Sequence, residues 1–172
     1  MNSTTLTGSE AARAAISAAL TRKLLVIADE TAECRIALRY AARRAQHTNG
    51  HLALLHVIAP TEFQNWSGVE ARMREEARAE AERLLYELAG EVTQIAGIVP
   101  ELVIREGSLK NEIIALTKED PSIGLMVLAA GTGRDGPGPL VSSLASDIVM
   151  VYPIPVTIVP GSMTPEAIDL IA

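Results

Sequence analysis

The chain has 172 residues, about the length of one domain. Apolar residues make up 48% of it and aromatic residues only 3%, so a packed core must be aliphatic, and intrinsic disorder is excluded. The 15 basic and 21 acidic residues give a net charge of −6. No run of Lys and Arg is longer than a pair, which argues against nucleic acid as a partner, because binding phosphates needs a concentrated basic face.

A single cysteine, Cys34, excludes an internal disulfide and provides no framework for a metal ion. No stretch reaches the ~18 consecutive apolar residues of a membrane-spanning helix, and the N-terminus lacks the pattern of a signal peptide. Composition therefore predicts a cytoplasmic protein with neither a membrane partner nor a bound metal.

The chain divides into a long regular region between two short terminal segments. Residues 1–21 are predicted to be a tail with a short helix over Ser9–Leu20, and residues 161–172 a C-terminal tail with a helical turn after Thr164-Pro165. Residues 22–160 are predicted to be one α/β domain.

Within that domain, short apolar runs alternate with stretches whose apolar residues recur at helical spacing. Thr31 is the expected N-cap of the first helix, and Asn49-Gly50 its stop. Pro155, inside the last predicted strand, cannot donate to a ladder and places that strand at the edge of the sheet. The strands are expected at Lys23–Ala28, His51–Ile58, Glu101–Arg105, Leu125–Leu128 and Ile154–Val159. One helix is expected over Glu70–Val92, and the apolar residues of the other three span Cys34–Ala45, Leu109–Leu116 and Val141–Val149.

This order predicts an open parallel sheet with helices on both faces, a three-layer, Rossmann-like architecture. Ligands of such sheets bind beyond the carboxyl ends of the strands, where the strand order reverses. The segments that follow the strands are therefore candidate binding residues: Asp29, the segment after Ile58, Arg105-Glu106, and the Gly/Pro-rich stretch Gly131–Pro139.

Residues Gly131–Gly136 spell G-x-G-x-x-G, but they follow the fourth strand and run into prolines, whereas a dinucleotide fingerprint follows the first strand and opens a helix. Two interpretations stay open. The segment is either a plain loop, or a phosphate cradle formed by the amides of Gly131 and Gly133, the charge of Arg134 and the hydroxyls of Ser142 and Ser143.

Two interpretations also stay open for Asp29 and for the aromatic pair Phe63 and Trp66. Asp29 either binds the sugar or base of a nucleotide or caps the following helix. Phe63 and Trp66 follow the second strand and either contact a ligand or partner or pack on the domain. Cys34 lies on the inner stripe of a helix and is expected to be a core residue, not a nucleophile. No nucleophile and base are paired by the sequence, so no catalytic residue is assigned.

The sequence resembles the universal stress protein family from Arg22 to Pro160. Three segments carry the resemblance: Lys23–Ala28 followed by Asp29, Leu55-His56-Val57-Ile58, and Ile154–Val159. It implies a five-stranded parallel sheet in the order 3-2-1-4-5. It also implies a homodimer joined through the edge strand Ile154–Val159.

The resemblance further implies a site for ATP or AMP between the ends of strands one and four. Asp29 and Val57 stand where the family contacts adenosine. The family's glycine motif G-x2-G-x9-G-[ST] falls on Ala129, Thr132, Ser142 and Ser143, so only its hydroxyl position is matched, although Gly131 and Gly133 lie nearby. The adenosine half of the site looks kept and the phosphate half altered.

We therefore expect a non-catalytic, nucleotide-binding stress-response protein. Nucleotide binding would order the Gly/Pro-rich stretch and change the surface offered to an unidentified protein partner. The alternative is a dimeric interaction module that binds no nucleotide because the glycine motif is altered. Slow nucleotide hydrolysis is a third interpretation.

Overall fold

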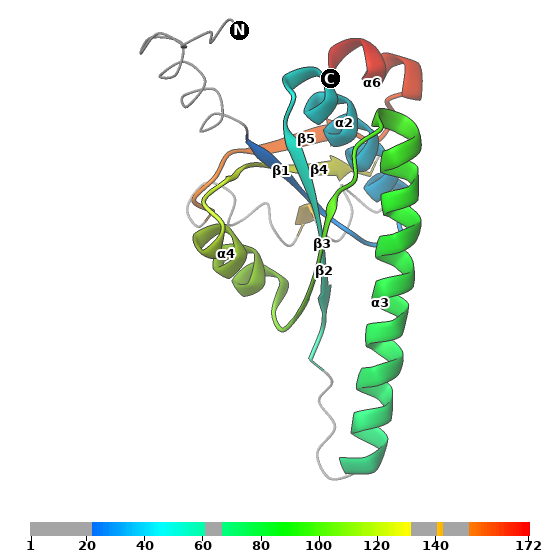
Figure 1. The fold of residues 1–172 in the computed structure, drawn as a ribbon, viewed down its shortest axis with the longest axis vertical. Helices are drawn as coiled ribbons and strands as arrows, with labels where there is room; N and C mark the ends of the chain where they lie inside the picture. Colours follow the sequence, from blue (N-terminus) through cyan, green and yellow to red (C-terminus); the bar gives the residue numbers. More distant parts are fainter. Residues whose placement is uncertain (1–21, 61–66, 132–140, 143–151) are drawn as a thin grey trace, which may run out of the picture.

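The computed structural model describes residues 22–60, 67–131, 141–142 and 152–172. Their strands form one parallel sheet in the order β3-β2-β1-β4-β5, which confirms the predicted topology (Figure 1). The strands are β1 (Lys23–Ile27), β2 (His51–Ile58), β3 (Glu101–Glu106), β4 (Ile123–Ala130) and β5 (Val156–Pro160). The helices are α2 (Ala32–Thr48), α3 (Ser67–Ala96), α4 (Leu109–Glu119) and α6 (Pro165–Ile171).

The sheet is buried on both faces, which explains the apolar excess of the sequence. Successive side chains of a strand point to opposite faces. In β1, Leu24 and Val26 pack toward α2 and α3, whereas Leu25 and Ile27 pack into a second cluster with residues of α4. In Figure 1, α2 and α3 lie on one side of the sheet and α4 on the other. The fold is therefore the predicted three-layer α/β arrangement.

Helix α2 begins and ends where the sequence predicts. The Thr31 hydroxyl accepts a hydrogen bond from the backbone N–H of Cys34 at 3.1 Å, so Thr31 is the N-cap. Asn49 takes a left-handed conformation, with φ of 52°, and ends the helix. Gly50 then donates its backbone N–H to the carbonyl of Ala45 at 2.8 Å. These local signals fix the length of α2 and hence the point where β2 starts.

Ion pairs attach the C-terminal helix α6 to α2. The hydroxyl of its N-cap, Thr164, accepts a hydrogen bond from the N–H of Ala167 at 3.3 Å. The guanidinium groups of Arg39 and Arg43 both bind the carboxylate of Asp169, with N–O distances from 2.6 to 3.2 Å. These hydrogen bonds lower the pKa of Asp169 below its ordinary value. These interactions hold α6 against α2, one of the helices that cover the sheet.

The structure corrects the last predicted strand. Strand β5 begins at Val156, so Pro155 lies just before the strand instead of inside it. The reason is that proline has no N–H to donate, while its carbonyl can still accept a hydrogen bond from the N–H of Met126, at 3.0 Å. The expected edge position is confirmed, because β5 pairs with β4 at the end of the strand order.

Several other elements differ from the prediction at their ends, and several predicted features lie outside the described residues. Strand β1 ends at Ile27, one residue before the predicted Ala28, and β3 extends one residue beyond the predicted Arg105. Helix α3 extends beyond the predicted Glu70–Val92 at both ends, and β4 extends beyond Leu125–Leu128. The helix over Ser9–Leu20, Phe63 and Trp66, and most of the helix over Val141–Val149 are not described. In the described part of the chain, no helix is both long and apolar enough to cross a membrane.

Candidate functional site

A cavity of about 450 Å³ lies at the carboxyl end of the sheet, between the ends of β1 and β2 and the helix α3. Its volume falls in the range of roughly 300–1,000 Å³ that is typical of small-molecule sites. Two predicted site residues line it, Asp29 directly after β1 and Val57 near the end of β2. The remaining lining comes from Glu30, His56, Ile58 and Ala59, and from Ala77, Glu80, Ala81 and Leu84 of α3.

Asp29 is held in place by the start of α2. Its Oδ1 accepts hydrogen bonds from the backbone N–H of Thr31, at 2.9 Å, and from the Thr31 hydroxyl. That same hydroxyl caps the helix, so Asp29 does not cap it directly and instead orients the residue that does. The other oxygen, Oδ2, has no hydrogen-bond partner within the described residues. Asp29 therefore combines a fixed position with an acceptor available to a ligand.

Val57 lines the same cavity as Asp29, but its side chain packs on the other face of the sheet. Its side chain packs with Leu55 in the cluster on the α4 side of the sheet, whereas the cavity lies on the α3 side. Because neighbouring residues of a strand alternate between faces, Val57 offers the cavity mainly its backbone. A ligand would be recognised here by peptide groups more than by an apolar side chain.

His56 is a lining residue that we did not assign from the sequence. Its Nδ1 lies 2.9 Å from the carbonyl oxygen of Ala28, the last residue before Asp29. Because a carbonyl oxygen only accepts, Nδ1 carries a proton, which leaves Nε2 as the acceptor of this tautomer. The sequence signal was the position of His56 beside Val57 at the end of a buried strand, in the segment Leu55-His56-Val57-Ile58 that carries the family resemblance.

The polar lining of the cavity is acidic. Glu30, Glu80 and Asp29 contribute carboxylates, and no Lys or Arg is among the described lining residues. Arg83, outside the cavity, lies 3.3 Å from the Glu30 carboxylate and 3.8 Å from that of Glu80, and all three side chains are exposed. Carboxylates accept hydrogen bonds from hydroxyl and amino groups but repel phosphate. This part of the site is suited to a sugar or a base, not to a phosphate chain.

A second cavity of about 360 Å³ adjoins the first and shares Ile58, Ala59 and Ala77 with it. It contains a cation, Arg74, whose guanidinium lies 3.5 Å from the carboxylate of Glu106 at the end of β3. The segment after Ile58 and Glu106, both predicted as candidates, thus lie at this end of the sheet. Together the two cavities run from β1 to β3.

Arg105 does not line either of these two cavities. Its guanidinium instead binds Glu119 of α4, at 2.5 and 3.3 Å, and lies 4.0 Å from Glu112. These carboxylates hold the pKa of Arg105 above its ordinary value. The side chain of Arg105 is therefore a link between β3 and α4, and of the predicted pair Arg105-Glu106 only Glu106 lines a cavity.

The predicted phosphate-binding residues are described only in part. Gly131 follows β4 and is half-buried, and Ser142 lies in a helical segment and is exposed. Neither belongs to the lining of the two cavities. Gly133, Arg134 and Ser143 lie outside the described residues. Their role in a phosphate cradle stays a prediction.

Cys34 lies close to the site but has the properties of a core residue. It is buried, and its thiol contacts the carbonyl oxygen of Ile27 at 3.6 Å. Burial raises the pKa of the thiol to about 11, so it stays protonated at neutral pH. Over the described ranges there is also no group of His, Cys, Asp and Glu side chains that could hold a metal ion.

A model of the universal stress protein family matches residues 21–160. No curated protein matches the chain in sequence.

Solved structures give a similar picture of the fold. The universal stress protein UspA from Lactobacillus plantarum is 20% identical, with a TM-score of 0.66, over 81% of this chain and 97% of its own. A universal stress protein in complex with cAMP is 16% identical, with a TM-score of 0.59, over 83% and 98%. A family protein from Arabidopsis thaliana with AMP bound is 18% identical, with a TM-score of 0.54, over 81% and 91%. At these identities the likeness establishes the shared fold.

Proposed function

Since the chain belongs to the universal stress protein family, we propose that it is a non-catalytic stress-response protein that binds AMP or ATP at the carboxyl end of its sheet. The observation that carries the proposal is the 450 Å³ cavity in which Asp29 and Val57 meet. Structural neighbours bound to cAMP and to AMP support the choice of an adenine nucleotide.

The adenosine part fits the acidic cavity by its hydrogen-bonding chemistry. Oδ2 of Asp29 would accept a hydrogen bond from a ribose hydroxyl, and the backbone of Val57 would contact the base. Nε2 of His56 offers one more acceptor at the same wall. These groups discriminate in favour of a donor-rich nucleoside, because a buried acceptor left without a donor is costly.

The phosphates would lie away from these carboxylates. We propose that they are bound by Gly131, Gly133, Arg134, Ser142 and Ser143, with free amides, one positive charge and hydroxyls as donors. Because the altered glycine motif offers a poorer cradle, the phosphates add little affinity. We therefore expect AMP to bind about as tightly as ATP.

Calorimetric titration of the full chain with AMP, ADP and ATP tests this proposal, together with mass spectrometry of ligands released from the purified protein. The variant Asp29→Asn keeps an acceptor for Thr31 but replaces one carboxylate oxygen by an amide that cannot accept. We expect it to raise the Kd of AMP about tenfold, equivalent to roughly 1.4 kcal/mol. Glu76→Gln, an exposed carboxylate on α3 outside both cavities, is the matched control.

Two outcomes would contradict the proposal. The first is the absence of both binding heat and co-purified nucleotide, which would favour the interaction module without a nucleotide. The second is equal AMP affinity in the wild type and Asp29→Asn, which would remove Asp29 from the site. Turnover of ATP that is lost on mutating Ser143 or Arg134 would replace the non-catalytic interpretation with slow hydrolysis.

We also propose that the protein forms a homodimer through β5, in the cytoplasm. Strand β5 is the last in the sheet order, and Ile158 on it is 42% exposed. An edge strand presents backbone groups that can pair with a second copy, and an exposed apolar side chain adds to the contact. Light scattering should give a dimer for the wild type and a monomer for Ile158→Lys. A monomeric wild type at micromolar concentration would disprove this interface.

A further inference from the structure

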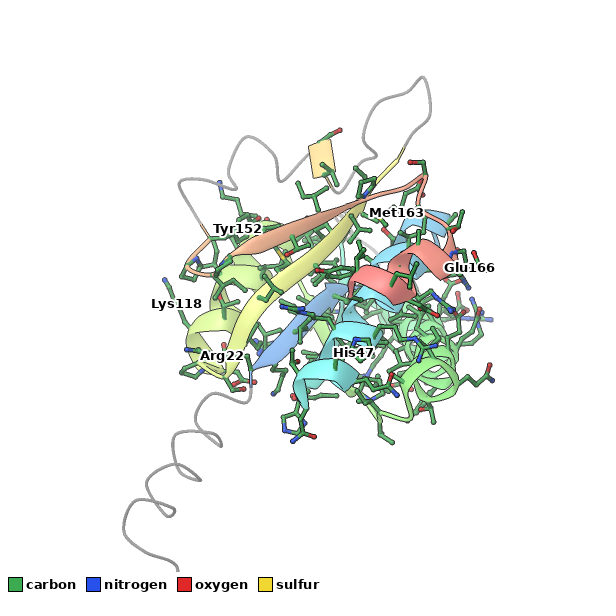
Figure 2. All side chains as sticks on the ribbon, turned by 90° about the horizontal axis from the view of Figure 1, so that it is seen from above. Arg22, His47, Lys118, Tyr152, Met163 and Glu166 are labelled. Atoms are coloured by element: carbon green, nitrogen blue, oxygen red, sulfur yellow. The ribbon has the colours of Figure 1, made fainter. Side chains whose placement is uncertain are left out.

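A third cavity, of about 300 Å³, lies at the opposite end of the sheet, where β1 and β4 begin and α2 ends. Its walls are Leu24 and Leu125, the last turn of α2, and Gly124, and two arginines, Arg22 and Arg44, complete the lining. Figure 2 shows Arg22 at the start of β1, away from the C-terminal helix. The cavity is therefore separated from Asp29 by the full length of β1.

The two arginines differ from their charged neighbours, which have counter-ions among the described residues. In α2, Arg35 binds Glu87 and Glu91, and Arg39 binds Asp169. Beside Arg22, the ammonium of Lys23 binds both Glu101 and Asp120. Neither Arg22 nor Arg44 has a carboxylate within 4.0 Å in the part of the chain that is described. Two arginines that have no carboxylate partner among the described residues therefore line one cavity of a protein whose net charge is −6, an arrangement that favours an anionic ligand.

The position of Arg22 depends on a glycine. The pairing of β1 with β4 shifts register between Lys23 and Leu24, so Gly124 has no partner residue on β1 and forms a bulge. A Cβ at Gly124 would lie 2.6 Å from Cδ and 3.1 Å from Cγ of Arg22. The Arg22 side chain therefore lies across the bulge in space that any larger residue would fill.

The lining defines the chemistry of a ligand. A guanidinium forms paired hydrogen bonds with the oxygens of a carboxylate or phosphate, and two of them favour an oxyanion. Leu24 and Leu125 offer an apolar surface next to these charges. We propose that this cavity is a second ligand site, which binds a small organic oxyanion with its charged end on Arg22 and Arg44 and its apolar body on the two leucines.

The size of the cavity limits the ligand to about one ring or a short chain. A volume near 300 Å³ is at the lower limit for small-molecule sites, so a complete nucleoside triphosphate is too large. The site is thus distinct in ligand class from the acidic cavity at the carboxyl end. It stands whether or not a nucleotide binds there.

Phenyl phosphate and benzoate are suitable probes, because they share an apolar ring and differ only in the oxyanion. Titration of the full-length, ¹⁵N-labelled protein should shift the amide signals of Leu24 and Gly124 and leave those of Asp29 and Val57 unchanged. We expect a Kd on the order of 1 mM or lower for at least one probe. The relative affinity of the two probes identifies phosphate or carboxylate as the preferred group, and benzyl alcohol, which has no charge, should not bind.

Matched variants separate the proposed contacts from general charge effects. Arg22→Gln and Arg44→Gln should each raise the Kd about tenfold or more, as expected for loss of a charge-assisted contact. Arg72→Gln removes the same charge from an exposed ion pair on α3 and should leave the Kd unchanged. Gly124→Ala should also weaken binding without changing any charge, because it displaces the Arg22 side chain.

Three results would overturn the proposal. One is the absence of shifts at Leu24 and Gly124 with both probes up to about 10 mM, well above the expected Kd. Another is an equal loss of affinity in Arg72→Gln and Arg44→Gln, which would show an unspecific effect of net charge. The third is a shift pattern centred on Asp29, which would place the anion at the other end. AMP affinity should be unchanged in all of the arginine variants.

Discussion

The cavities beside Asp29 and Arg22 lie at opposite ends of the same sheet, and their charged lining residues have opposite sign. At the carboxyl end, the cavity beside Asp29 is lined by carboxylates and a histidine. At the amino end, the cavity beside Arg22 is lined by two arginines that have no carboxylate partner among the described residues. Both have apolar walls, so charge is what distinguishes them. The comparison indicates that one α/β domain can have two separate cavities, one suited to a donor-rich ligand and the other to an anionic ligand.

The difference arises from which side chains are neutralised within the protein. Near the amino end, Lys23 binds Asp120 and Glu101, whereas its neighbour Arg22 has no carboxylate partner among the described residues. Near the carboxyl end, one oxygen of Asp29 binds Thr31, and the other has no partner in the described part of the chain. At each end, we expect the group left unpaired to set the class of ligand.

The largest expected effect is a loss of stability in the core that supports both ends of the sheet. Leu25 lies in the middle of β1 and is fully buried in the cluster on the α4 side. Leu25→Ala should lower the free energy of unfolding by about 3 kcal/mol, through lost burial and a residual cavity. Chemical denaturation measures it. If the folded variant loses affinity at only one end, the ends are not supported by a common core, and the comparison fails.

A smaller effect is expected at the carboxyl end alone. His56→Leu removes the donor to the carbonyl of the buried Ala28 and should lower the free energy of unfolding by about 1–2 kcal/mol. The same variant should weaken AMP binding and leave phenyl phosphate binding unchanged. His56→Asn, whose amide can replace Nδ1 as donor, should recover most of the stability. Equal loss in both variants would contradict a role for this hydrogen bond.

The amino end should show a pH-dependent effect. The hydrogen bond from Lys23 lowers the pKa of Asp120 below 3.8, its ordinary value. This stabilisation is present above the unfolded-state pKa and is lost as the pH falls through the lower native value. Asp120→Asn keeps an acceptor for Ser122 but not the charge, and should cost about 1 kcal/mol at pH 7.

The difference between the wild type and Asp120→Asn should therefore narrow in acid unfolding experiments as the pH drops below the ordinary carboxyl range. A difference that is constant from neutral to strongly acidic pH would show that the Lys23–Asp120 pair is not its source. Phenyl phosphate binding should not weaken in this variant, because removing a carboxylate makes the amino end more positive.

The smallest effect is expected away from both ends. Arg72 and Glu76 form an exposed i,i+4 pair on α3, at 3.1 Å. Arg72→Gln should change the free energy of unfolding by less than about 0.5 kcal/mol and leave both affinities unchanged. If Arg72→Gln raised the Kd of phenyl phosphate as much as Arg44→Gln does, net charge and not the local lining would control anion binding.

Much of the fold could be predicted because its signals are local. The cap at Thr31, the left-handed stop at Asn49 and the buried runs of β1 and β2 depend on a few neighbouring residues each. The strand order was predicted through the family resemblance carried by such segments. Pro155 also gave the edge position of β5, although the strand itself begins one residue later, because only the carbonyl of a proline can join a ladder.

The sequence by itself determined the α/β class, the approximate positions of the strands, and Asp29 as a residue at the carboxyl end of the sheet. The tertiary structure decided which polar groups are left unpaired. Arg105 is occupied by Glu119, whereas Arg22 and Arg44, from different elements, line one cavity. Periodicity reports how each segment is buried, but a counter-ion comes from another segment of the folded chain. The lack of partners for Oδ2 of Asp29 and for the guanidinium groups of Arg22 and Arg44 among the described residues is therefore a property of the packed molecule.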